Sequence, residues 1–158
     1  ISMRLMRTLT AMTTLGLLLG FGTAAAQSLV PPGTIATGVD LQKALAEAPA
    51  GPMAVARIET TETTRVNLIH RTIPQNAIIH ATGWEVHHIT DGSGTVVTGG
   101  RVVRSTGPDG ERVATIEEGD SRVVTVGDVV IIPAGTPHWY SDIDGSVTYL
   151  EIRYDPGS

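Results

Sequence analysis

The stretch Gly127-Asp128-Val129-Val130-Ile131-Ile132-Pro133-Ala134-Gly135-Thr136-Pro137-His138 predicts a strand, a tight turn and a histidine just beyond the turn. Gly127-Asp128 is a turn signal, and the β-branched run 129–132 is typical of a strand that is buried on both faces. Pro133 ends the strand because it has no N–H group to donate, and Gly135 permits the bend that follows. We therefore expect the imidazole of His138 to be held beside the end of this strand.

This stretch resembles the second sequence motif of the cupin family, G-x5-P-x-G-x2-H, at all four of its fixed positions. The resemblance implies an all-β fold, a double-stranded β-helix or jelly-roll barrel, with a metal ion on the axis of the barrel. It also implies that His138 is a ligand of that ion. Cupins frequently form dimers through their N-terminal strands, so we expect a homodimer.

The segment around Glu85 resembles the first cupin motif, H-x-H-x(3,4)-E-x6-G. Glu85 matches the family carboxylate, and His80 matches the second histidine with four residues between them. Ile78 then stands in place of the first histidine and cannot bind a metal ion. Alternatively, His80 is the first histidine of a shorter variant and Thr82 takes the second place. In both alignments one family ligand is absent.

The resemblance implies the ligand set His80, Glu85 and His138, a two-histidine-one-carboxylate arrangement that leaves coordination positions open. Such donors suit a divalent transition metal, namely Fe(II), Mn(II), Ni(II) or Zn(II), and the sequence does not choose among them. Side chains alternate along a strand, so His87 shares a face with Glu85, whereas His88 points to the opposite face. His87 is therefore a candidate for a fourth metal ligand or for a catalytic acid/base group.

Five further side chains are candidates for lining a substrate pocket: Trp84, Trp139, Tyr140, His70 and Arg71. The aromatic residues flank the proposed site in the sequence and would also serve as ordinary packing. His70 lies on the same strand face as Val66 and Leu68, which suggests core or pocket lining rather than ligation. Arg71 and Arg153 would hold an anionic substrate by bidentate contacts, or lie at the surface as most strand arginines do.

Composition excludes several classes of function. The chain has 158 residues and no cysteine, so disulfides and thiolate metal sites are excluded. Its formal net charge is −5 and no basic cluster occurs in the body, which argues against a nucleic-acid partner. No phosphate-binding glycine loop or G-x-S-x-G nucleophile motif is present.

The N-terminal residues 1–26 are typical of a secretory signal peptide. Arg4 and Arg7 supply a positive start, 15–21 is a short apolar run, and Ala24-Ala25-Ala26 offers a small-residue cleavage site. The apolar run is too short for a comfortable membrane span, and a buried or interfacial N-terminal helix is the other interpretation. We expect a periplasmic or secreted protein with no membrane span after removal of the signal.

The remaining chain is expected to form an N-terminal arm with a short helix (27–55, helix 39–48) and a cupin barrel (56–154). Ten short strands alternate with glycine-rich turns, as in an antiparallel sandwich or barrel. The expected strands are 53–60, 64–71, 77–80, 85–90, 95–98, 101–105, 112–116, 122–126, 129–132 and 147–154. Asp91-Gly92-Ser93-Gly94 is interpreted as a hairpin turn, and the surrounding segment looks like the central hairpin of the family.

Two functions follow as expectations. The first is a metal-dependent enzyme that acts on a small oxygenated organic molecule by dioxygenase, isomerase, decarboxylase or lyase chemistry. The second is a non-catalytic cupin that binds a small ligand or metal in the periplasm. The missing family histidine favours the second, and fold alone does not decide between them.

Overall fold

The computed structural model describes residue 30 and residues 32–156, and the predicted signal peptide at 1–26 lies outside them. The chain divides into two units, Ile1–Gly33 and Thr34–Ser158. The described residues of the first unit are exposed and form no helix or strand. Among the described residues, no helix combines the length and apolar character that crossing a membrane requires.

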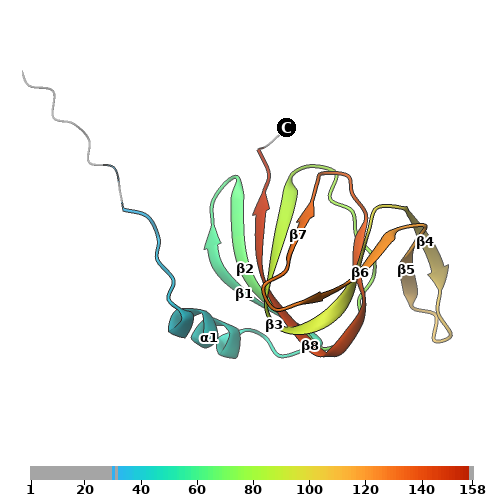
Figure 1. Ribbon diagram of the computed structural model, residues 1–158, viewed down its shortest axis with the longest axis horizontal. Helices are drawn as coiled ribbons and strands as arrows, with labels where there is room; N and C mark the ends of the chain where they lie inside the picture. Colours follow the sequence, from blue (N-terminus) through green and yellow to red (C-terminus); the bar gives the residue numbers. More distant parts are fainter. Residues whose placement is uncertain (1–29, 31, 157–158) are drawn as a thin grey trace, which may run out of the picture. The chain divides into compact units, whose positions relative to one another are not determined.

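The second unit is an all-β structure with one short helix, as expected (Figure 1). Its elements are α1 (Gly38–Glu47), β1 (Met53–Thr60), β2 (Thr64–Arg71), β3 (Trp84–Thr98), β4 (Arg101–Thr106), β5 (Arg112–Glu117), β6 (Asp120–Thr125), β7 (Val129–Ile132) and β8 (His138–Tyr154). The expected strand at 77–80 does not form, because only Ile78 makes an isolated bridge, to His138.

Helix α1 begins at a capping box. The Thr37 hydroxyl accepts a hydrogen bond from the backbone N–H of Asp40 (3.3 Å), and the Asp40 carboxylate accepts one from the N–H of Thr37 (2.8 Å). The pair satisfies two N–H groups that the first helical turn would otherwise leave unpaired. The helix contacts β1 and β2, and it confirms the prediction for 39–48 within one residue at each end.

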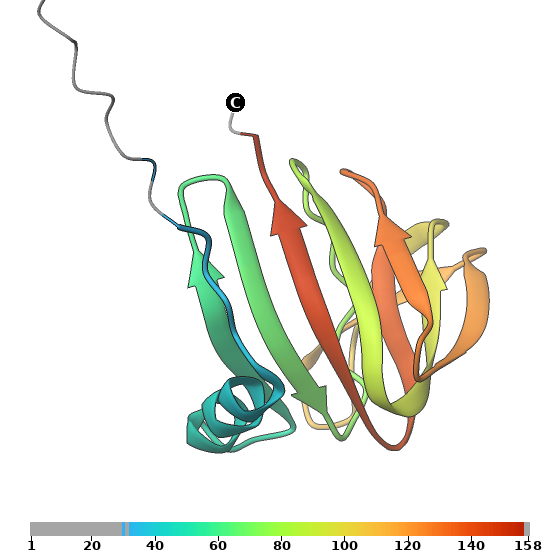
Figure 2. The ribbon, with the colours of Figure 1, turned by 60° about the vertical axis from the view of Figure 1, so that its left-hand side comes forward.

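Six strands form one antiparallel sheet in the order β1-β2-β8-β3-β6, with β7 also paired to β3, while β4 and β5 form a separate hairpin. The first half of β3 pairs with β7 and its second half pairs with β6. Strand β8 accompanies β3 along both halves. Since both long strands curve near their midpoints (Figures 1 and 2), the sheet folds back on itself into a jelly-roll barrel.

The bend of β3 lies at the sequence that we interpreted as a hairpin turn, so that prediction is wrong. Gly92 has a φ of +71°, and a Cβ atom there would lie 1.9 Å from the carbonyl oxygen of Ser146 on β8. The pairing of β3 with β8 shifts register on both sides of this glycine. Asp-Gly thus marks bulges at which the strand changes direction and continues, since a bulge and a tight turn need the same backbone freedom.

The interior of the barrel is built from rows of side chains that β2, β8 and β3 contribute by direct pairing. Three successive rows are Arg65–Arg153–Glu85, Asn67–Glu151–His87 and Ile69–Tyr149–Ile89. The third row belongs to the main hydrophobic core, together with Val96, Val124, Tyr140 and Val147. One end of the interior is therefore polar, and the remainder is apolar.

Strand β7 is buried on one face only, which corrects the prediction of a strand buried on both faces. Val130 and Ile132 point inward, whereas Val129 and Ile131 are 55% and 68% exposed. A β-branched run satisfies strand propensity whether or not both faces are covered. The sequence pattern therefore identified the strand and could not report what covers it.

Candidate metal centre

Glu85 is the centre of the polar end of the barrel. It lies at the start of β3, between Arg153 of β8 and Ile132 of β7, and is only 3% exposed. A carboxylate at such a depth is stable only when charged or hydrogen-bonding groups surround it. The residues that surround it come from three separate parts of the chain.

His138 and His80 are held against each other by the backbone. His138 is the first residue of β8, and its N–H and C=O pair with those of Ile78. The turn that precedes His138 donates the N–H of Gly135 to the carbonyl oxygen of His80 (2.8 Å). Gly135 has a φ of +75°, as the predicted bend requires. These contacts hold the two imidazole rings next to each other, with 5.5 Å between their centroids.

Three imidazole nitrogens converge on the Glu85 carboxylate. The Nε2 atom of His80 lies 3.0 Å from Oε1, and the Nε2 atoms of His87 and His138 each lie 3.3 Å from Oε2. The ligand atoms of His80, Glu85 and His138 lie within 4.8 Å of one another, as the donors of one metal ion would. His87 and Glu85 form a second such group with Glu151.

The hydrogen bond at Nδ1 of His138 determines what its other ring nitrogen, Nε2, can do. Nδ1 lies 3.0 Å from the carbonyl oxygen of Thr136, which only accepts, so Nδ1 carries the proton. In the neutral imidazole Nε2 would then offer its lone pair to a metal ion, and this atom is buried without a hydrogen-bond partner among the described residues. A backbone carbonyl that holds a histidine in this tautomer is a usual support for a metal ligand. The donor set therefore fits a divalent cation.

The charge of Glu85 is also suited to a cation. Burial raises the pKa of its carboxyl group, but the imidazoles of His138, His80 and His87 outweigh this effect. The pKa of Glu85 consequently lies well below its usual range, and the group is an anion at neutral pH.

Glu151 is a member of the site that the sequence analysis missed. Its carboxylate lies 4.0 Å from Nε2 of His87 and accepts a hydrogen bond from Nδ2 of Asn67 (2.8 Å). Alternation along β8 puts Glu151 on the same face as Tyr149 and Arg153, and this was visible in the sequence. The register of β8 against β3, which brings Glu151 beside His87, was not visible in the sequence.

Arg153 brings a positive charge to the same cluster. Its Nη1 atom lies 3.6 Å from Oε1 of Glu85 and 3.3 Å from Nε2 of His80. The sequence analysis left open whether Arg153 binds an anionic substrate or lies at the surface. Its guanidinium is instead largely buried, with 18% of the side chain exposed.

A small cavity of about 20 Å³ adjoins the cluster of Glu85, His87 and His138. Glu85, His87 and His138 line it, together with Arg71, Asn76, Ile78, Trp139, Tyr140, Tyr149 and Glu151. This volume accommodates about one water-sized molecule. Only a small group of a ligand therefore reaches this side of the cluster.

Two buried tyrosines shape the cavity. The Tyr140 hydroxyl lies 3.2 Å from Nδ1 of His87, and the Tyr149 hydroxyl accepts a hydrogen bond from Nε of Arg71 (2.8 Å). Burial raises the pKa of both phenols, that of Tyr149 to about 12, although Arg71 opposes the rise. Both phenols are therefore neutral at physiological pH, and Tyr140 can donate to or accept from His87.

The structure brings some predicted substrate residues to the centre and leaves others apart. Arg71, Trp139 and Tyr140 line the cavity, and Trp139 also borders a groove of about 500 Å³ beside β5. Trp84 is 42% exposed on the opposite face of β3, with its ring 5.9 Å from that of Tyr154. His70 also lies on the outer face, where Nδ1 is 2.9 Å from the Thr148 hydroxyl.

Comparison with known proteins identifies the fold. No protein-family model and no curated protein matches the sequence. Among solved structures, the chain is similar to the cupin domain of Schizosaccharomyces pombe Cnp3 (TM-score 0.53, 10% identity), covering 70% of this chain and 66% of that one. It is also similar to protein NMB1881 from Neisseria meningitidis (TM-score 0.52, 15% identity), covering 78% of this chain and 100% of that one.

A third similar structure is KdgF from Halomonas sp. (TM-score 0.50, 12% identity), covering 68% of this chain and 82% of that one. At sequence identities this low, structural similarity shows a shared fold and does not show a shared activity. The strand order, the bent strands β3 and β8, and these similarities agree on one architecture. The chain has the cupin fold.

Proposed function

We propose that this chain is a metal-dependent cupin enzyme that acts on a small oxygenated organic molecule. In this proposal His80, Glu85 and His138 hold a divalent transition metal, with His87 as a fourth ligand or as the neighbouring acid/base group. The observation that carries the proposal is the buried Nε2 atom of His138, which makes no hydrogen bond to a described residue and lies 3.3 Å from Oε2 of Glu85, while the carbonyl oxygen of Thr136 holds Nδ1. A mixed histidine and carboxylate donor set suits Fe(II), Mn(II), Ni(II) or Zn(II).

When bound, such an ion would polarise a substrate oxygen or activate water. The protein residues would supply the proton pathway. His87 connects the Tyr140 hydroxyl at Nδ1 with Glu85 at Nε2, so one imidazole reaches both a neutral phenol and the ligand cluster. A proton held at either nitrogen is close to the place where a substrate oxygen would bind. The narrow cavity would exclude bulk water from that place.

A non-catalytic cupin that binds a small ligand or metal in the periplasm is the second candidate. Two observations favour it. One family histidine is absent, with Ile78 or Thr82 in its place, and Arg153 lies 3.6 Å from Glu85, where its charge opposes a cation. Such a protein would bind ligand without turnover.

The experiment that separates the two candidates is a turnover assay on protein loaded with each of the four metals in turn. Oxygen consumption and product formation would be followed with phenolics, diketones and hydroxy acids. We expect turnover with at least one metal, and its loss in His138→Ala but not in the control His88→Ala, because His88 is exposed on the outer face. Ligand binding by all metal-loaded forms without turnover would favour the binding protein.

Export and dimerisation are further proposals. We infer that residues 1–26 direct export and that the mature chain forms a homodimer in the periplasm or outside the cell. N-terminal sequencing of the exported protein should give Gln27 as the first residue. Light scattering of that protein should give twice the mass of the mature chain, and a monomer would contradict the dimer.

A further inference from the structure

Two arginines lie directly opposite each other at the polar end of the barrel. Arg65 of β2 pairs with Arg153 of β8, and Arg153 pairs with Glu85 of β3. Directly paired residues of neighbouring strands project from the same face of the sheet, so the two guanidinium groups are neighbours. Like charges in this arrangement are destabilising unless an anion lies between them.

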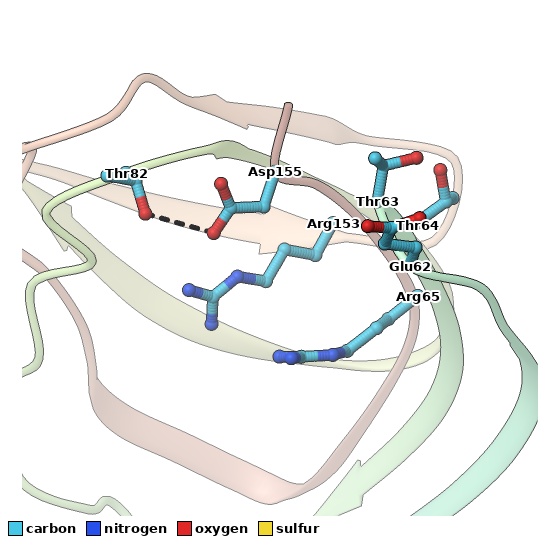
Figure 3. Close-up of a pocket in the computed structure, with 7 residues that line it drawn as sticks. All are labelled: Glu62, Thr63, Thr64, Arg65, Thr82, Arg153 and Asp155. Carbon is cyan, nitrogen blue, oxygen red and sulfur yellow. Dashed lines mark hydrogen bonds between the residues drawn. The ribbon is translucent and has the colours of Figure 1, made fainter. Parts of the chain in front are cut away.

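These arginines line a pocket of about 240 Å³ at the end of the barrel. Figure 3 shows both guanidinium groups extending in the same direction from their strands. The pocket is otherwise lined by residues with hydroxyl or carboxylate groups: Glu62, Thr63, Thr64, Thr82 and Asp155. Its size suits part of a small metabolite rather than a macromolecule.

Both guanidinium groups have N–H donors without a hydrogen-bond partner among the described residues. Arg153 places Nη1 beside His80 and Glu85, yet its Nε atom is buried and makes no hydrogen bond to any described residue. The side chain of Arg65 is exposed and forms no ion pair or hydrogen bond within the described part of the chain. A buried donor without a partner is costly, and a carboxylate or phosphate oxygen would satisfy it.

The two acidic residues of the pocket, Asp155 and Glu62, belong to the chain segments that border it. The Asp155 carboxylate accepts a hydrogen bond from the Thr82 hydroxyl (2.9 Å), and its backbone N–H donates to the carbonyl oxygen of Thr63 (2.7 Å). These contacts tie the end of β8 to the two loops that border the pocket. Glu62 is exposed on one of those loops.

We propose that this pocket binds the oxyanion group, a carboxylate or a phosphate, of the substrate. Arg65 and Arg153 share the anion, and Arg153 connects it with the metal centre through Glu85 and His80. The inference rests on the proposed function, since it assigns a substrate class to that site. The substrate is then a small acid or phosphoester whose oxygenated part reaches the ion while its anionic end lies in this pocket.

The test uses full-length protein stripped of metal, titrated by calorimetry with inorganic phosphate and, in a separate arm, with succinate. Two variants of the exposed Arg65 are compared with wild type, Arg65→Gln and Arg65→Lys. Arg104→Gln is the matched control, because Arg104 is exposed on the separate β4–β5 hairpin. The two arms distinguish a phosphate from a carboxylate as the preferred group.

We expect at least one of the two anions to bind wild type, and to bind Arg65→Gln about tenfold more weakly. Arg65→Lys should bind with intermediate affinity, because it keeps the charge and loses the bidentate fork. Arg104→Gln should match wild type. The proposal is overturned if neither anion binds wild type, or if Arg65→Gln binds as tightly as Arg104→Gln.

A parallel titration with Mn(II) alone separates this inference from the proposed function. Arg65 is not among the candidate ligands, so Arg65→Gln should bind Mn(II) as wild type does. Mn(II) binding with anion binding that does not depend on Arg65 would reject the pocket and keep the metal centre. Anion binding that depends on Arg65, in a protein without affinity for Mn(II), would keep the pocket and reject the metal centre.

Discussion

The two ends of the barrel interior are built from the same three strands and differ in almost every physical respect. Glu85, which is surrounded by imidazoles and Arg153, lies only four positions along β3 from Ile89, which is completely buried among apolar side chains. Tyr149 on β8 and Ile69 on β2 complete the apolar row. The backbone pairing is continuous through both ends, so the difference lies in the side chains alone.

This difference separates stability from function. The apolar row removes large side chains from water, which is the main favourable contribution to folding. The polar rows instead bury charged and hydrogen-bonding groups, which contribute little net stability and are easily replaced by apolar residues in a structural core. Polar rows next to an apolar core therefore indicate a role in function rather than in stability. Four predictions test this division, from the largest expected effect to the smallest.

Shortening the apolar row should cost the most stability. Ile89 is 0% exposed, so Ile89→Ala should lower the free energy of unfolding by about 2–5 kcal/mol through lost burial and the cavity that remains. Chemical denaturation measures the change. Ile131→Ala is the control, because Ile131 is 68% exposed and should change stability by less than about 0.5 kcal/mol. Equal effects in the two variants would contradict the assignment of the core.

The bend that joins the two halves of the barrel should be nearly as sensitive. Gly92→Ala adds a Cβ atom 1.9 Å from the Ser146 carbonyl oxygen at a φ of +71°, so about 2–4 kcal/mol of stability should be lost. Gly110 has a φ of +82° with no atom within 4 Å of the new Cβ position. Gly110→Ala should therefore cost only the backbone strain, about 1–2 kcal/mol. Thermal unfolding of both variants compares close contact with strain, and similar losses would exclude a close approach at Gly92.

Two adjacent histidines should differ in their effect on the metal centre. His87 points into the polar rows and is 2% exposed, whereas His88 is exposed on the outer face. His87→Gln should weaken Zn(II) binding about 10–100-fold, whether His87 is a ligand or orients Glu85. His88→Gln should leave the affinity within about twofold of wild type. A larger effect at His88 would mean that the metal binds elsewhere.

The smallest effect is expected at Asn67, the member of the polar rows whose side chain cannot ionise. Its Nδ2 atom donates to Glu151 (2.8 Å), so Asn67→Ala should cost about 1 kcal/mol of stability. Zn(II) affinity should fall by less than in His87→Gln, because Glu151 lies beside His87 rather than beside His138. Thr34→Ala removes a side-chain hydrogen bond of the same length away from these rows, to the carboxylate of Glu59 (2.8 Å), and should leave Zn(II) affinity unchanged. A fall in affinity greater than that of His87→Gln would show that the second row, not Glu85, organises the site.

The sequence predicted the parts of the site that depend on local pattern. The spacing of Pro133 and Gly135 placed His138, and alternation put His87 on the face of Glu85. Long-range pairing supplied the rest. Glu151 and Arg153 reach the site only because of the register of β8 against β3, which no local pattern contains. The arginine pair also depends on the register of β2, since Arg65 lies far from Arg153 in the sequence.

The errors have a physical explanation as well. Asp-Gly at 91–92 permits a tight turn and a bulge equally, and the partner strand decides between them. The run 129–132 fits a strand with one covered face as well as a strand with two. Trp84 and His70 are close to the site in sequence, but alternation directs both to the outer face. Proximity in sequence was therefore a weaker guide than strand parity.

The central claim is that the polar end of the barrel binds one divalent cation through Glu85 and its neighbouring histidines. The most direct test is a Zn(II) titration of metal-stripped wild type and Glu85→Gln, with elemental analysis of both proteins after dialysis. The account predicts one ion per wild-type chain and an affinity at least about 100-fold lower in Glu85→Gln, since the variant loses the ligand charge. Wild type that retains no ion, or Glu85→Gln that retains it with unchanged affinity, would contradict the account.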